Sequence, residues 1–170
     1  MTVLARTTGA DDTRKLAAAL AELTRPGDVI LLGGDLGAGK TAFAQGLARG
    51  LGVTESVTSP TFMLARQYLG RLVLHHLDVY RLDHMEELFD IGLPELLDEG
   101  AVTVIEWGDA IAAALPPDYL EIKFAFDDDD ASDDNRALTL RAVGSRWAAR
   151  NRAVVTALES WIVGGGQQGC

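Results

Sequence analysis

Apolar residues recur at the spacing of an α-helix in three stretches of the chain. The first helix is expected to begin near Thr13, with Asp11 or Asp12 as its N-terminal cap. The second is expected over residues 40–51 and the third over residues 145–162. Their buried faces are expected to carry Leu16, Leu20 and Leu23, then Phe43, Leu47 and Leu51, and finally Trp147, Val154, Val155, Leu158, Trp161 and Ile162.

Other stretches have the patterns of β-strands. The runs DVILL (28–32) and VTVIE (102–106) are continuously apolar, which is typical of buried parallel strands. A turn at Gly70-Arg71 separates two flanks rich in Val, Leu, Tyr and Phe, so we expect an antiparallel hairpin there. Two further strands, YLEIKFAF and ALTLRAV, alternate on either side of the acidic stretch 127–135, which we expect to be a solvated hairpin loop.

The remaining segments connect these elements. Residues 85–100 predict two short helical pieces that are broken at 92–94, and residues 109–115 predict a short helix that ends at Pro116. The order of helices and strands predicts an α/β protein, a three-layer sandwich around a mixed, partly parallel sheet. A single domain is expected over residues 1–163, and the tail 164–170 (GGGQQGC) is expected to be disordered.

Composition and charge narrow the range of possible functions and locations. The chain of 170 residues has a formal net charge of -10, which disfavours strong direct binding of nucleic acid. The cluster of Arg141, Arg146, Arg150 and Arg152 is most simply a solvated helix face. A single cysteine, no apolar run long enough to span a membrane and no signal-like N-terminus predict a cytoplasmic protein.

The stretch GDLGAGKT (34–41) matches the phosphate-loop pattern G-x-x-x-x-G-K-[ST], and it lies between a predicted buried strand and a predicted amphipathic helix. In this pattern the glycines let backbone N–H groups approach phosphate oxygens at the start of a helix. The sequence therefore predicts a P-loop NTPase-like fold that binds ATP and Mg²⁺. The expected nucleotide contacts are Asp35, Leu36, Gly37, Ala38, Gly39, Lys40, Thr41 and Ala42. Lys40 would reach the β- and γ-phosphates, and the Thr41 hydroxyl would ligate Mg²⁺.

A phosphate loop of this kind needs a second acidic group for the metal. Asp78 and Glu106 each end an apolar strand, and both are candidates; the sequence does not say which lies closer to Mg²⁺. The segment 59–62 (SPTF) is placed where a switch could sense the γ-phosphate, or it could simply be a turn that initiates a strand. Arg81 is the best candidate in the chain for stabilising phosphate charge.

His75 and His76 are neighbours on one predicted strand, so they should face opposite ways and are expected to be structural.

Several classes of phosphate-loop protein lack support. No N-K-x-D segment for guanine recognition follows the loop, and no L-S-G-G-Q segment is present, so a Ras-like GTPase and an ABC ATPase are disfavoured. A small-molecule kinase and a non-catalytic, nucleotide-gated binding module remain as alternatives to an ATPase.

Four segments in this order resemble the TsaE family: GDLGAGKTAFAQGLARGLGV, VTSPTFMLARQY, LHHLDVYRL and IGLPELLDEGAVTVIEWGD. The resemblance implies an ATPase, slow on its own, that acts with the TsaB–TsaD pair in threonylcarbamoyladenosine modification of tRNA beside the anticodon. It implies contact with tRNA only through that complex. It also implies catalytic roles for Lys40, Thr61, Asp78 and Glu106, a metal site at Thr41, Asp78 and Glu106, and a nucleotide contact at Trp107.

Overall fold

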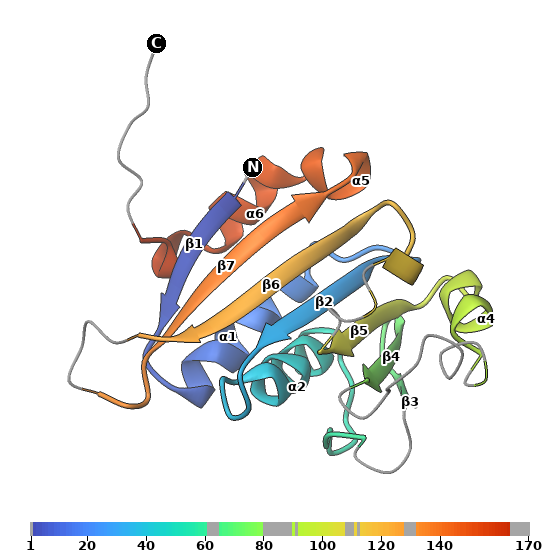
Figure 1. The fold of residues 1–170 in the computed structure, drawn as a ribbon, viewed down its shortest axis with the longest axis horizontal. Coiled ribbons are helices and arrows are strands. Elements are labelled where there is room, and N and C mark those ends of the chain that lie inside the picture. The colour runs from blue at the N-terminus through green and yellow to red at the C-terminus, as the bar shows by residue number, and fades with distance from the viewer. Residues whose placement is uncertain are drawn as a thin grey trace.

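A seven-stranded mixed sheet forms the centre of the computed structural model, which describes residues 2–60, 65–79, 90, 92–107, 111, 113–127 and 132–163 (Figure 1). The strands are β1 (Thr2–Thr7), β2 (Val29–Gly34), β3 (Ala65–Leu69), β4 (Val73–Asp78), β5 (Val102–Glu106), β6 (Tyr119–Phe126) and β7 (Arg136–Val143). Their order across the sheet is β1-β7-β6-β2-β5-β4-β3. β2 runs parallel to β5 and β6, β4 runs parallel to β5, and the other neighbouring strands are antiparallel. The mixed, partly parallel sheet and both expected hairpins are thereby confirmed.

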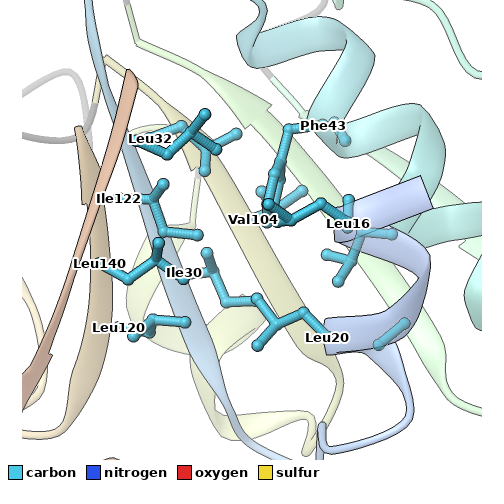
Figure 2. Close-up of a cluster of buried hydrophobic side chains, with 14 of the residues drawn as sticks. Leu16, Leu20, Ile30, Leu32, Phe43, Val104, Leu120, Ile122 and Leu140 are labelled. Carbon is cyan, nitrogen blue, oxygen red and sulfur yellow. The ribbon is translucent and has the colours of Figure 1, made fainter. Parts of the chain in front are cut away.

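All the helices of the described residues except α4 (Leu93–Asp98) lie on one face of this sheet. The helices are α1 (Ala10–Ala21), α2 (Lys40–Gly50), α4 (Leu93–Asp98), α5 (Ser145–Ala148) and α6 (Asn151–Ala157), followed by the 3₁₀ helix η2 (Glu159–Trp161). Leu16 and Leu20 of α1 and Phe43 of α2 pack against Ile30 and Ile122 of the sheet (Figure 2). This cluster continues to Trp147, Val154 and Leu158 near the C-terminus, so the expected buried face of that region is present.

The opposite face of the sheet is covered less completely. A second cluster joins Leu31, Leu77 and Ile105 to Leu93 of α4 and to Ile111. Over β6 and β7 the same face exposes about half of the side chains of Lys123 and Arg141, 58% and 52% of their area. Within the described residues, the third layer that the sequence predicted therefore spans only the part of the sheet around β2, β5 and β4.

Two local predictions were wrong, and one strand was not predicted. The strand β1 was not expected, although its side chains alternate between exposed and buried along residues 2–7. Helix α1 begins at Ala10, three residues before Thr13, and Asp12 accepts a hydrogen bond from the Thr8 backbone N–H at 3.0 Å. The C-terminal helix is interrupted at Arg150, whose backbone (φ -99°, ψ 2°) separates α5 from α6.

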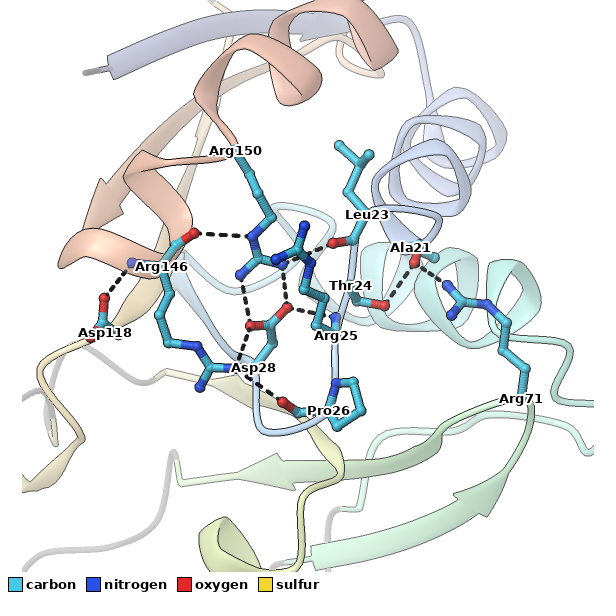
Figure 3. A network of polar contacts seen from close by, with 10 residues as sticks. All are labelled: Ala21, Leu23, Thr24, Arg25, Pro26, Asp28, Arg71, Asp118, Arg146 and Arg150. Atoms are coloured by element: carbon cyan, nitrogen blue, oxygen red, sulfur yellow. Dashed lines mark hydrogen bonds and ion pairs between the residues drawn. The ribbon is translucent and has the colours of Figure 1, made fainter.

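Arg150 is also the exception to the solvated arginine cluster, because it is only 6% exposed. Its Nη1 and Nη2 donate to the two oxygens of Asp28 at 2.6 and 2.7 Å, a bidentate ion pair (Figure 3). Nη1 also donates to the Leu23 carbonyl at 2.8 Å, and the guanidinium lies 3.9 Å from the centre of the Trp147 ring. This network fastens the C-terminal helices to the turn that leads into β2.

The last described residues return to the edge of the sheet. Ile162 forms an antiparallel bridge with Ala5 of β1, and the Val163 N–H donates to the Leu4 carbonyl at 3.0 Å. The outer edge of β1 is therefore partly occupied by the chain itself.

Arg150→Met tests the buried ion pair. Since the carboxylate of Asp28 would remain buried without its partner, we expect the free energy of unfolding to fall by about 3–5 kcal/mol, measured by urea denaturation. Arg152→Ala is the matched control, because Arg152 is exposed on the neighbouring helix and should change stability little. Equal effects of the two substitutions would contradict the assignment.

Candidate functional site

The glycine-rich loop (residues 34–41) joins the end of β2 to the start of α2, as the sequence predicts. Gly34, Gly37 and Gly39 have positive φ angles of 130°, 77° and 107°. A Cβ atom at Gly34 would lie 2.4 Å from the carbonyl oxygen of Phe124 in the neighbouring strand. Glycine is therefore required both for the turn and for the close approach of the loop to β6.

Lys40 lies at the first position of α2 and is 4% exposed. Its Nζ donates to the carbonyl oxygens of Gly34 and Asp35, each at 2.7 Å. The same Nζ lies 3.7 Å from the centre of the Trp107 ring, a distance typical of a cation–π contact. The ammonium group is thus held at the loop by two carbonyls and one aromatic face.

Trp107 follows β5 and has a left-handed backbone conformation with φ 63°, the only such non-glycine residue among the described ones. Its backbone N–H donates to the Leu32 carbonyl at 2.7 Å. A bulky residue is strained in this conformation, so the contacts around it have to hold it there. Backbone strain of this kind is concentrated at functional sites.

The two candidate carboxylates lie side by side. Asp78 and Glu106 are paired in register at the ends of the parallel strands β4 and β5, at the edge of the sheet where the loop lies (Figure 1). The Thr41 hydroxyl donates to Glu106, with its oxygen 3.1 Å from Oε1 and 3.3 Å from Oε2. The Ser59 hydroxyl donates to Asp78 Oδ2 at 3.0 Å. Of the two carboxylates, Glu106 therefore contacts the glycine-rich loop, and Asp78 contacts the SPTF segment.

His76 belongs to this cluster, although the sequence predicted only a structural role for it. Its Nε2 lies 2.8 Å from Glu106 Oε1, and both side chains are almost fully buried. His76 and Asp78 are two residues apart on β4 and so share the face of the sheet on which Glu106 lies. The alternation of side chains along β4 could have placed His76 on the same face as Asp78. It could not have shown that Glu106 lies beside them, because that depends on which strand neighbours β4.

His75 faces the other way, as predicted. Its Nε2 lies 3.1 Å from Glu99 Oε2 without the geometry of a hydrogen bond. Among the described residues, no three His, Cys, Asp or Glu side chains gather as a ready metal cage.

The other predicted nucleotide contacts lie along the loop and the first turn of α2. Leu36 at the tip is 76% exposed, while Ala38 and Ala42 are buried. Thr61 and Arg81 lie outside the described residues, as do residues 128–131 of the acidic loop and the tail 164–170. Predictions about them stay predictions.

The model of the family described as "Threonylcarbamoyl adenosine biosynthesis protein TsaE" matches residues 7–137. The chain belongs to the TsaE family. Its relatives include the TsaE protein of Bacillus subtilis, 43% identical over 84% of this chain and 87% of the relative, and that of Treponema pallidum, 44% identical over 77% and 94%. The TsaE resemblance seen in the four sequence segments is thereby confirmed.

A solved structure supports the fold. The crystal structure of Bacillus subtilis YdiB superimposes with a TM-score of 0.77 at 36% sequence identity, covering 92% of this chain and 95% of the other. No helix within the described part of the chain is long and apolar enough to cross a membrane.

His76→Leu tests the contact with Glu106. Because Glu106 would lose a buried hydrogen-bond donor, we expect the free energy of unfolding to fall by about 1–3 kcal/mol in urea denaturation. His76→Gln keeps an N–H donor and should recover part of this loss. His75→Leu, at the neighbouring buried position, removes no hydrogen bond and should cost less; a larger loss there would contradict the assignment.

Proposed function

We propose that this TsaE-family protein is an Mg²⁺-dependent ATPase that supports threonylcarbamoyladenosine modification of tRNA together with the TsaB–TsaD pair in the cytoplasm. The observation that carries the proposal is the contact of Thr41, on the glycine-rich loop, with the buried carboxylate of Glu106 at 3.1 Å. A loop hydroxyl and a strand-end carboxylate are the groups that phosphate-loop proteins use to hold Mg²⁺ beside phosphates.

The hydrogen-bond donors, the positive charge and the oxygen ligands in the site fit ATP and Mg²⁺. The helix start and the positive-φ glycines offer backbone N–H groups to phosphate oxygens, and Lys40 adds a positive charge at the same place. Thr41 and Glu106 supply the hard oxygen ligands that Mg²⁺ prefers, with Asp78 beside them directly or through water. When bound, the metal would offset negative charge that develops on the phosphate oxygens.

The residues around this cluster would have separate tasks. His76 contacts Oε1 of Glu106 and so holds the carboxylate where both of its oxygens lie near the Thr41 hydroxyl. Asp78, which accepts a hydrogen bond from the Ser59 hydroxyl, is proposed to orient a water for attack on the γ-phosphate. Thr61 and the segment around Arg81 are proposed to act as switches.

The Ser59–Asp78 hydrogen bond couples the SPTF segment, residues 59–62, to the proposed catalytic carboxylates. Movement of Ser59 would therefore change the environment of Asp78, and the reverse is also true. A partner that contacts the SPTF segment could use this bond to set the hydrolysis rate. The contact gives a physical route from partner binding to the site.

The two alternative functions predict a different fate for the γ-phosphate of ATP. A small-molecule kinase would transfer the labelled γ-phosphate of ATP to a metabolite, and a nucleotide-gated module would bind ATP without releasing phosphate. Our proposal predicts free phosphate, released slowly by the protein alone and faster after addition of the TsaB–TsaD pair and tRNA. Label on a metabolite, or no release in the full mixture, would exclude the ATPase.

Lys40→Ala and Glu106→Gln test the site itself. Since each removes one charge expected beside the phosphates or the metal, we expect phosphate release to fall on the order of 100-fold in each variant. Lys15→Ala is the control for Lys40, because Lys15 is exposed on α1, and its activity should be unchanged. Wild-type activity in Lys40→Ala would refute the assignment.

Trp107 offers an optical test of the same site. ATP phosphates are expected to draw the Lys40 ammonium away from the indole ring, so tryptophan fluorescence should change when ATP and Mg²⁺ are added. The change should disappear in Trp107→Phe, in which Trp147 and Trp161 still emit. A change of the same size in Trp107→Phe would mean that the signal arises elsewhere.

A further inference from the structure

A cavity of about 270 Å³ lies beside the second half of α2 and is lined on its other side by the segment 53–57. This volume has room for several water molecules, and so for a small polar ligand. The lining comes from α1, α2 and that segment, and none of the candidate residues of the glycine-rich loop or of the strand ends belongs to it. This space, called the α2 cavity below, is therefore separate from the site already described.

The wall formed by α1 and α2 is firmly placed. The two helices lie side by side (Figure 1), and a Cβ atom at Gly46 of α2 would collide with the backbone of Arg14 in α1. A Cβ atom at Gly50 would lie 2.6 Å from the Ala21 Cβ. Glycine at these two positions lets the helices approach to backbone contact. This close approach fixes the place of Arg14 relative to α2.

Two arginines contribute positive charge to the α2 cavity. Arg14 Nε donates to Gln45 Oε1 at 3.0 Å, and its Nη1 donates to Asp11 Oδ1 at 2.7 Å. The Asp11 side chain is 91% exposed, so water screens this ion pair. Arg49, in the last turn of α2, is exposed and forms no hydrogen bond or ion pair with the part of the chain that the structure describes. Its whole fork of N–H donors is therefore available to a ligand.

The opposite wall, the segment 53–57, is tied to α2 at both ends. The Val53 N–H donates to the Ala48 carbonyl at 3.0 Å, and Gln45 Nε2 donates to the Val57 carbonyl at 3.0 Å. Gln45 therefore joins Arg14 on one wall to the backbone of the other wall. Between these two attachments the residues 54–56 are exposed.

These three exposed residues complete the polar lining. Thr54 and Ser56 add hydroxyl groups, and Glu55 is the only acidic residue that lines the α2 cavity. Two guanidinium groups and one carboxylate leave a surplus of positive charge, on a chain whose formal net charge is -10. A local surplus of this kind attracts anions. Because donors line both sides, the arrangement suits the tetrahedral oxygens of a phosphate better than a flat carboxylate.

We propose that the α2 cavity is a second anion site, which binds a phosphate group between the guanidinium groups of Arg14 and Arg49. The hydroxyl groups of Thr54 and Ser56 are the further donors. The phosphate group can belong to a small phosphate monoester or be the free ion, because both present the same oxygens to the arginines.

A ligand in this place contacts both walls and so fastens the segment 53–57 to α2. The segment leads directly to Ser59, whose hydroxyl donates to Asp78 Oδ2 at 3.0 Å. Occupancy of the α2 cavity therefore changes the freedom of Ser59 and the environment of Asp78. The effect on ATP hydrolysis rests on the proposed function, whereas the binding of phosphate does not.

NMR titration of the full-length protein without nucleotide tests the binding residue by residue. The probes are glycerol 3-phosphate and inorganic phosphate, with acetate at equal ionic strength as the comparison. Both phosphate probes should cause saturable shifts of the backbone N–H signals of residues 54–56 and of the Arg49 side chain, and the tighter of the two identifies the source of the phosphate group. Acetate should bind roughly tenfold more weakly. No saturable shift, or equal affinity for acetate, would overturn the proposal.

The same titration separates this site from the proposed function. Phosphate that binds at the glycine-rich loop shifts the signals of residues 34–41 with its own affinity, so the two events are read independently. The Ser59 N–H signal should move together with those of residues 54–56. A Ser59 signal that stays in place would overturn the coupling to Asp78. Failure of the protein to hydrolyse ATP would refute the proposed function and leave these shifts unaffected.

Two substitutions in the lining are expected to act in opposite directions. Arg49→Gln removes a cation and should weaken phosphate binding roughly tenfold. Glu55→Gln removes the repelling carboxylate and should strengthen it about threefold. Both side chains are exposed, so both variants should fold. An unchanged affinity in Arg49→Gln, or changes of the same sign in the two variants, would show that the lining does not hold the ligand.

Each substitution has a matched control outside the α2 cavity. Arg152→Gln changes an exposed arginine on α6, which lies on the other side of α1 from α2 (Figure 1). Glu95→Gln changes an exposed carboxylate on α4, which packs on the opposite face of the sheet. Both controls should bind phosphate as the wild type does. A loss in Arg152→Gln equal to that in Arg49→Gln would mean that only the overall charge of the protein matters.

Discussion

The parallel alignment of β2, β5 and β4 is the constraint on which the candidate site depends. It brings the end of β2, where the glycine-rich loop starts, to the same edge as Glu106 and Asp78. The loop can take its path only because Gly34 lies against the backbone of β6, where any side chain would collide with the Phe124 carbonyl. A shift of one residue in the β2–β5 pairing would turn Glu106 to the other face of the sheet, away from Thr41, and a shift in the β4–β5 pairing would separate it from His76 and Asp78.

Local patterns predicted much of this arrangement. The apolar runs before Gly34 and Glu106 are continuous because both strands are buried on both faces, so their ends could be found from the sequence alone. The chemistry of the loop is likewise local, since its glycines, Lys40 and Thr41 lie within eight consecutive residues. In these features, residues that are close in the sequence are also close in the structure, so the sequence pattern is enough to find them.

What the sequence did not predict depends on partners far away along the chain. The break at Arg150 accompanies an ion pair with Asp28, 122 residues earlier. β1 is stabilised by pairing with β7, more than a hundred residues later. His76 gains its role from Glu106, 30 residues away on the next strand. Each would have required strand order and register, which side-chain pattern alone does not give.

If the loop holds phosphates as proposed, the position of Lys40 has a consequence for which anions would bind there. Its ammonium group already has two carbonyl oxygens and an indole face as neighbours, so an incoming ligand has to replace internal contacts rather than fill an open positive pocket. A small anion such as inorganic phosphate offers few contacts in return, whereas a chain of phosphates can engage the whole loop at once. In the proposed nucleotide site, Lys40 would therefore favour binding of a chain of phosphates over binding of inorganic phosphate from the surrounding solution.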